Sequence, residues 1–282
     1  MSDRRIKVGV IGVGSLGQHH ARIYSQMKDV ELVGVFDTDR SRCEKVAGEH
    51  RTKAFSAMSE LASKIEAASI VVPTDLHRQV AGELIEQGIH LLVEKPISAT
   101  TAEAEEMVSL AQEKKVILQV GHVERFNPVL GFLDKWKTRP RFIEAHRLAP
   151  YPPPREGLLP RGTEVSVVLD LMIHDLEVIL HLVGKPVKDI RAVGVPVLSK
   201  SEDIANVRLL FEGDCVANVT ASRISKDRMR KIRCFFEDAY ISLDYQNQTG
   251  EIYRKGLVGI KREEVAIEKG EPLANELKSF VR

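Results

Sequence analysis

One lysine in this sequence has the type and placement to act on hydroxyl oxygens. Lys95 follows the apolar residues 91–93 and directly precedes Pro96. Proline fixes its own φ and restricts the preceding residue to extended geometry, so the ammonium would be held in a defined place. Its three donors would reach more than one oxygen of a bound ligand. A surface lysine with a buried stem is the alternative interpretation.

A carboxylate and an imidazole form a second candidate pair. Asp170 and His174 lie four residues apart in VVLDLMIHDLEVIL, so a helix would place them on one face. A neighbouring carboxylate raises the pKa of an imidazole and orients it as an acid or base near neutral pH. A charge such as Asp170 within an apolar run is costly unless it is paired and hydrogen-bonded, which makes it a candidate for a function. The alternatives are a solvent-exposed helix face, or a metal site formed by His174, Glu177 and His181.

Residues 12–17 match the pattern G-x-G-x-x-G, after an apolar strand pattern and before a helix pattern. Gly12 would make a tight turn, Gly14 would let the backbone approach a pyrophosphate, and Gly17 would let the helix pack on the strand. The free N–H groups of the helix start favour phosphate. The predicted phosphate-binding residues are Gly12, Gly14, Ser15, Leu16 and Gly17.

Asp37 ends the next strand pattern, twenty residues after Gly17, and Thr38 follows it. A carboxylate at this position accepts hydrogen bonds from adenosine ribose hydroxyls and repels a 2′-phosphate, which favours NAD over NADP. Arg40, nearby in the sequence, weakens that preference.

Polar residues also follow the later strand patterns. In an open parallel sheet, ligands bind beyond the carboxyl ends of the strands. Asp75 and His77 would alternatively only cap the next helix. The residues expected at this edge of the sheet are Pro73, Thr74, His77, Glu94, Lys95 and His122.

The elements that position these residues follow from the hydrophobic pattern. In residues 1–121, short apolar strands alternate with helices, which predicts an α/β Rossmann domain with a doubly wound parallel sheet. Residues 122–282 contain a proline-rich loop, a helix at about 164–183, and period-2 strands, two of them joined by a turn at 212–214. This half is predicted to be an α+β domain with an open, mainly antiparallel sheet. Because the chain stops within a helical pattern, we expect a further C-terminal piece.

Composition excludes several function classes. The 282 residues are 43% hydrophobic, enough for a full core, and net charge is +1, which argues against nucleic-acid and anionic-membrane partners. No apolar run approaches the ~18–20 residues that span a bilayer. Cys43, Cys215 and Cys234 form no CxxC pair, which suits a reducing cytoplasm and gives no metal signal.

These motifs together resemble the Gfo/Idh/MocA family of oxidoreductases. The resemblance rests on VGVIGVGSLGQHHARIY, VVPTDLH, VEKPIS, QVGHVERFNP and LDLMIHDLEVIL, in the family's order. It implies an NAD-dependent dehydrogenase in which Lys95 contacts the nicotinamide ribose and the substrate, before a frequently cis Lys95–Pro96 bond. His174 would be the acid/base, assisted by Asp170. The C-terminal sheet would form a homo-dimer or homo-tetramer.

Two motifs, GHVERFNP and DLMIHDLE, are similar to the branch of UDP-N-acetylglucosamine 3-dehydrogenases, which make a 3-keto sugar for later amination in lipid A or surface-polysaccharide synthesis. This similarity implies substrate binding by Lys95, Asp170 and His174, with further residues near the nicotinamide and sugar. Arg155 and Arg161 would approach a diphosphate, or are plain loop charges. The alternatives are a dehydrogenase of a free sugar or inositol, and a non-catalytic NAD-sensing protein. The further residues expected near the nicotinamide and the sugar are His122, Glu124, Arg125 and Asn127.

Overall fold

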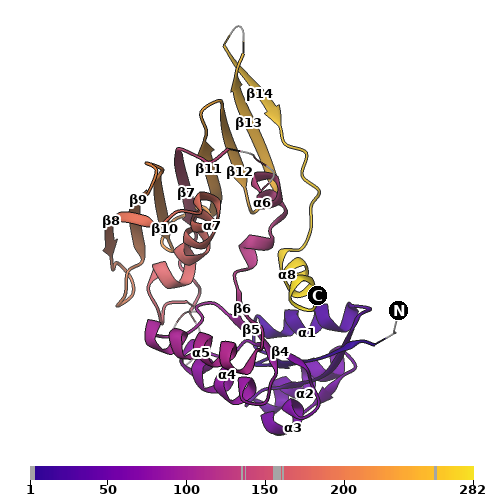
Figure 1. The fold of residues 1–282 in the computed structure, drawn as a ribbon. Coiled ribbons are helices and arrows are strands. Elements are labelled where there is room, and N and C mark those ends of the chain that lie inside the picture. The colour runs from indigo at the N-terminus through magenta and orange to yellow at the C-terminus, as the bar shows by residue number, and fades with distance from the viewer. Residues whose placement is uncertain (1–3, 135, 137, 155–159, 161, 257–258) are drawn as a thin grey trace. The chain divides into compact units, whose positions relative to one another are not determined.

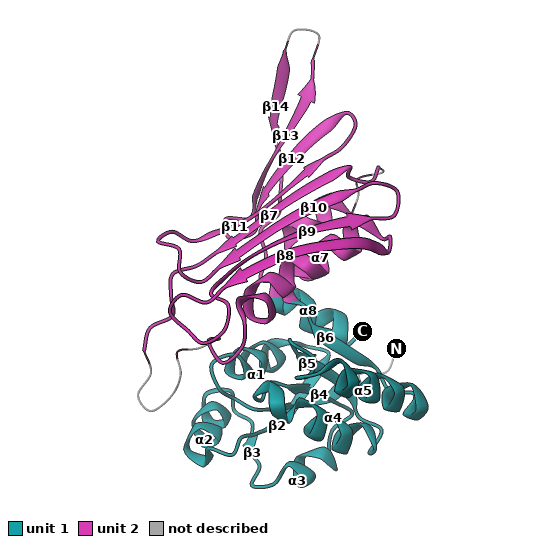
Figure 2. Ribbon diagram, turned by 90° about the vertical axis from the view of Figure 1, so that its left-hand side faces the viewer, with its two compact units in different colours: residues 1–122, 273–282 teal, residues 123–272 magenta. Residues whose placement is uncertain are grey.

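The computed structural model describes residues 4–134, 136, 138–154, 160, 162–256 and 259–282 (Figure 1). The chain forms two compact units (Figure 2). Unit 1 comprises residues 1–122 and 273–282, and unit 2 comprises residues 123–272. The last ten residues therefore belong to the first unit, whereas the domain predicted from the sequence at residues 122–282 included them.

Unit 1 contains the expected doubly wound parallel sheet. Its six strands run in the order β3-β2-β1-β4-β5-β6, and each neighbouring pair is parallel. The order reverses between β1 and β4, which is where ligands bind in such sheets. The strands are β1 (Ile6–Ile11), β2 (Val30–Phe36), β3 (Lys53–Ala54), β4 (Ala67–Ile70), β5 (His90–Glu94) and β6 (Leu118–Gly121).

Helices cover this sheet, and burial explains why its strands are apolar throughout. Every residue of β4 is buried, as are Val8, Val10 and Ile11 of β1. The C-terminal helix contributes Leu277, Phe280 and Val281 to the core cluster beside β1. The helices are α1 (Gly17–Gln26), α2 (Arg40–Glu49), α3 (Met58–Ala62), α4 (His77–Ile85), α5 (Thr101–Lys114) and α8 (Pro272–Phe280), with a 3₁₀ turn at Thr74–Leu76.

Unit 2 is built on a mainly antiparallel sheet, as predicted. Its eight strands run in the order β14-β13-β12-β11-β7-β10-β9-β8, with β7 and β10 parallel and the other described pairs antiparallel. The strands are β7 (Phe142–Leu148), β8 (Val187–Val195), β9 (Ile204–Phe211), β10 (Val216–Ser222), β11 (Met229–Phe235), β12 (Ala239–Asp244), β13 (Thr249–Lys255) and β14 (Ile260–Glu264).

One face of this sheet packs on helix α7 (Ile173–Val183). Ile143 and Ala145 of β7 share a buried cluster with Val178 and Ile179 of α7. The predicted turn at 212–214 connects β9 to β10, and Gly213 there has a left-handed φ of 85°. The smaller elements are a 3₁₀ turn at Val123–Phe126 and helix α6 (Pro128–Leu133).

The helix predicted at about 164–183 differs from the observed structure at its start. A π-helical turn spans Val168–Met172, and regular α-helix begins only at Ile173. The carbonyls of Gly162 and Val165 accept hydrogen bonds from the side chain of Arg223, which a local pattern does not reveal. The helix ends as predicted at Gly184, which is left-handed with φ 56°.

Among the described residues, we find no helix that combines the length and apolar character needed to cross a bilayer.

Candidate functional site

The glycine turn of unit 1 has the geometry that a dinucleotide requires. Gly12 has a φ of 84°, and a Cβ there would lie 2.5 Å from the carbonyl oxygen of Val71. A Cβ on Gly17 would lie 1.8 Å from the carbonyl oxygen of Gly12, so α1 can approach β1 only through glycine. A Cβ on Gly14 would meet open space, which leaves room for a pyrophosphate at this turn. Ser15 and Leu16 are exposed just before α1 begins.

Asp37, at the end of β2, connects this turn to the second strand. Its carboxylate accepts hydrogen bonds from the backbone N–H groups of Val13 and Asp39, both at 2.8 Å. A carboxylate has about four acceptor positions, so Asp37 retains capacity for ribose hydroxyls. The guanidinium beside it belongs to Arg42, at 3.5 Å, while Arg40 pairs with Glu44. Arg42 lies in the first turn of α2, and its position in the sequence, five residues after Asp37, was a signal for this contact. Thr38 is exposed at the same edge.

Lys95 lies at the carboxyl end of β5, as predicted, and is half-buried. Its backbone N–H donates to Glu94 Oε2 at 3.2 Å, and Glu94 Oε1 lies 3.1 Å from Nε2 of the buried His20 in α1. The Lys95–Pro96 peptide bond is cis, as the family resemblance implied. His20 was missed by the sequence reasoning, because one histidine in a helix carries little signal by itself.

His77 fixes the turns that follow β4 and β5. Its ring is buried, with Nδ1 3.0 Å from the carbonyl oxygen of Pro96 and Nε2 3.0 Å from that of Val72. The ring therefore joins two strand ends, and none of the side chains that the structure describes caps α4. Pro73 is exposed and Thr74 is half-buried. His122 follows β6 and is also half-buried.

In unit 2, the two predicted acid–base residues lie in consecutive elements. Asp170 is in the π-helical turn and His174 is in the first turn of α7, and both are half-buried. π-Helical turns inside helices occur frequently at functional sites. The left-handed Gly162 packs directly against the Asp170 carboxylate.

A buried charge cluster lies next to these residues in the sequence. Arg147 of β7 donates to Asp175 Oδ2 at 2.6 Å and Oδ1 at 3.3 Å, and to Glu124 Oε1 at 2.8 Å. All three side chains are at most 8% exposed. Burial opposes charge on Arg147, yet the two carboxylates raise its pKa. Burial raises the pKa of Asp175, whereas Arg147 and Asn127 outweigh burial at Glu124 and lower its pKa.

Two predicted substrate-binding residues have protein partners in unit 2. Asn127 is buried, caps α6 by accepting from the Val129 N–H, and donates to Glu124. Arg125 forms an ion pair with Glu177 and donates to His181 Nδ1 at 2.9 Å. Glu177 and His181, considered above as metal ligands, therefore bind a guanidinium. Arg155 and Arg161 lie outside the described residues.

Comparison with known proteins places this geometry in a family. Residues 6–122 match the oxidoreductase family with an NAD-binding Rossmann fold, and residues 138–242 match the GFO/IDH/MocA C-terminal domain. The chain is 38% identical, over 98% of its length, to the UDP-N-acetylglucosamine 3-dehydrogenase of Acidithiobacillus ferrooxidans, and covers 88% of that protein. The chain belongs to the Gfo/Idh/MocA oxidoreductase family. It is an NAD-dependent dehydrogenase by class, and unit 1 carries the NAD-binding fold.

Solved structures agree with this assignment. The structure of the same A. ferrooxidans enzyme matches with a TM-score of 0.91 over 98% of this chain and 88% of that one. Levoglucosan dehydrogenase in complex with NADH matches with a TM-score of 0.89 at 16% identity, over 99% of this chain and 89% of that one, which shows the shared fold. Among the sequence relatives, the scyllo-inositol 2-dehydrogenase of Bacillus subtilis is 26% identical over 79% of this chain and 69% of that protein.

Proposed function

We propose that this family member oxidises the C3 hydroxyl of a UDP-linked N-acetylhexosamine with NAD. The observation that carries the proposal is the 38% identity, over 98% of the chain, to a UDP-N-acetylglucosamine 3-dehydrogenase. The product would be a 3-keto sugar, whose carbonyl suits a following amination in the cytoplasmic synthesis of lipid A or a surface polysaccharide.

The residues present fit NAD. Gly14 leaves open space at the glycine turn, and the Asp37 carboxylate disfavours a 2′-phosphate. Bound NAD would supply the hydride acceptor. His174 would take the hydroxyl proton as the C–H hydride leaves and the C=O bond forms, with Asp170 orienting the imidazole. The ammonium of Lys95 would stabilise the oxygen as negative charge develops on it.

The mechanism predicts that Lys95→Met and His174→Ala each lower turnover about 10²-fold or more, and that His174→Ala leaves NAD binding unchanged. Turnover is measured as NADH absorbance with UDP-N-acetylglucosamine, and NAD binding by calorimetry. Lys64→Met, at an exposed lysine, is the matched control. Unchanged turnover in both Lys95→Met and His174→Ala would remove this mechanism.

The same assay separates the alternative functions. Several relatives are inositol dehydrogenases, including the B. subtilis enzyme above. Turnover of an inositol without turnover of UDP-sugars would support that substrate class. NAD binding without turnover of either would support a regulatory role.

We also propose that unit 2 assembles through the sheet face opposite α7. A row of aromatic rings crosses four neighbouring strands there, with centroid distances of 5.4, 4.6 and 5.1 Å between successive rings. Aromatic side chains are enriched at the buried centres of protein interfaces. A homo-dimer or homo-tetramer would cover this row. Its members, in order across the sheet, are Phe142, Phe235, Tyr240 and Tyr253.

A further inference from the structure

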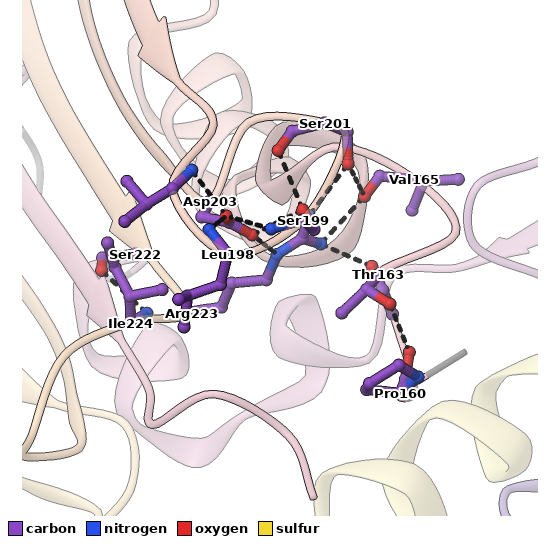
Figure 3. A network of polar contacts seen from close by, with 12 residues as sticks. Pro160, Thr163, Val165, Leu198, Ser199, Ser201, Asp203, Ser222, Arg223 and Ile224 are labelled. Atoms are coloured by element: carbon purple, nitrogen blue, oxygen red, sulfur yellow. Dashed lines mark hydrogen bonds and ion pairs between the residues drawn. The ribbon is translucent and has the colours of Figure 1, made fainter. Parts of the chain in front are cut away.

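A fully buried arginine organises the segment that precedes the π-helical turn (Figure 3). Arg223 directly follows β10, and its side chain is 2% exposed. A guanidinium has five N–H donors, and here the five hydrogen bonds use all of them. The acceptors are Asp203 Oδ1 at 2.7 Å, the carbonyl oxygens of Gly162 at 2.6 Å and Val165 at 2.8 Å, and the hydroxyls of Ser199 and Ser201, both at 2.9 Å.

Asp203 holds this arginine in place. It is fully buried and also accepts hydrogen bonds from the backbone N–H groups of Val197, Leu198 and Ser199 at 2.6–2.9 Å. Burial alone would raise the pKa of Asp203, but these donors and Arg223 hold it well below its usual range. The carboxylate is therefore charged at neutral pH, and breaking this buried pair would be costly.

The segment fixed in this way lies against a proposed active-site carboxylate. A Cβ on Gly162 would lie 2.3 Å from Oδ2 and 2.7 Å from Cγ of Asp170. Nothing larger than glycine fits between this backbone and the carboxylate. Because Gly162 is held through its own carbonyl by Arg223, the backbone cannot readily retreat from Asp170.

We propose that Gly162 and Arg223 are positioning residues for Asp170, and that they fix the direction in which its carboxylate faces. The inference rests on the proposed function, in which Asp170 orients His174. Arg223 acts through the backbone of residues 162–165, and Gly162 acts through the side chain it lacks. Turning the carboxylate would change the hydrogen bonding and the pKa of the imidazole, and with them the pH dependence of turnover.

The test is Gly162→Ala, with Gly213→Ala as its matched control. Both glycines are left-handed, with φ 82° and 85°, so alanine strains the backbone similarly at either position. Among the described residues, a Cβ on Gly213 meets nothing within 4 Å, whereas one on Gly162 must displace the Asp170 carboxylate. We expect Gly162→Ala to lower kcat by about 10²-fold, the cost of a displacement of about 1 Å, and to shift the pH profile of kcat. Gly213→Ala should change neither, and KM for NAD should be unchanged in both.

A further pair of variants separates this proposal from the proposed function. If Asp170→Asn does not alter kcat, the role of Asp170 in the proposed mechanism fails. If Asp170→Asn lowers kcat but Gly162→Ala behaves like Gly213→Ala, the positioning role is overturned.

Arg223→Lys keeps the positive charge and loses most of the hydrogen bonds to the segment. We expect it to shift the pH profile of kcat, with kcat expressed per folded molecule. The folded fraction is measured by active-site titration and thermal unfolding. A purely structural role would lower the folded fraction and leave that profile unmoved, which would also overturn the proposal.

Discussion

Arg147 offers the clearest quantitative prediction in unit 2. Its guanidinium is the shared partner of Asp175 and Glu124, and replacing it with methionine would leave two carboxylates that are 0% and 8% exposed. Removing one partner of a buried ion pair costs about 3–5 kcal/mol. A domain is stabilised by only roughly 5–15 kcal/mol. For a unit of this size, about 2–4 °C is lost per kcal/mol, so Arg147→Met should lower Tm by roughly 6–20 °C.

The pH dependence of this loss has a definite sign. In the wild type, the pKa of Glu124 is lowered, so its stabilising effect is present above its unfolded pKa of about 4.3 and is lost as pH falls. Burial raises the pKa of Asp175, so Asp175 destabilises the folded state as pH rises above its unfolded pKa of about 3.9. Without the guanidinium, burial would raise both folded pKa values, although Arg230, 3.7 Å from Glu124, would still oppose this rise. The folded variant would then take up protons, and its destabilisation should be largest at pH 8 and shrink towards pH 5.

Thermal unfolding of the full chain across this pH range measures both effects. Arg141→Met is the matched control, because Arg141 pairs with Glu237 on the surface, where the side chains are 70% and 77% exposed. Exposed pairs contribute little. A loss in Arg147→Met as small as in Arg141→Met, or one that grows as pH falls, would refute the reasoning.

Two further predictions concern the cofactor and the assembly. Asp37→Ser should raise KM for NAD about 10–100-fold and weaken the preference over NADP, because a hydrogen bond to a charged group contributes about 1.5–3 kcal/mol. Asp39→Ser, which keeps a helix-capping acceptor, is its control, and equal effects in both variants would contradict the assigned role of Asp37. Tyr240→Arg, within the aromatic row, should lower the mass measured by light scattering to that of one chain. An unchanged mass would argue against assembly through that sheet face.

The features predicted correctly from the sequence are those encoded locally. The glycine turn, the strand ends and the change from alternating to period-2 strands all depend on residues close together in the chain. Asp37 and Lys95 were therefore placed correctly at the carboxyl ends of β2 and β5. The residues that define a turn type or a buried strand lie within a few positions of one another in the sequence.

The features that were missed depend on partners far apart in the sequence. The start of the 164–183 helix was wrong because Arg223 binds carbonyls some sixty residues earlier. Arg125 contacts Glu177 and His181, more than fifty residues away, and these partners were missed, while its substrate role stays a prediction. An arginine looks the same in a sequence whether it is exposed or surrounded by acceptors, so local patterns could not separate these cases.

Two buried arginines bind residues that lie close in the sequence to the proposed acid–base pair. Arg147 of β7 binds Asp175, the neighbour of His174, and Arg223, at the end of β10, fixes the backbone beside Asp170. The parallel register pairs Arg147 with Ala221, only two residues before Arg223. Burying charge is a poor way to gain stability, because apolar replacements of whole clusters are often neutral or stabilising.

The benefit of these charges would then be one fixed arrangement of the π-helical turn. Arg147→Met combined with Glu124→Gln and Asp175→Asn removes the buried charges together, so it should recover much of the Tm lost in Arg147→Met. If the charges serve positioning, kcat should stay low in this folded variant. Recovery of Tm and kcat together would mean that the cluster contributes to stability alone.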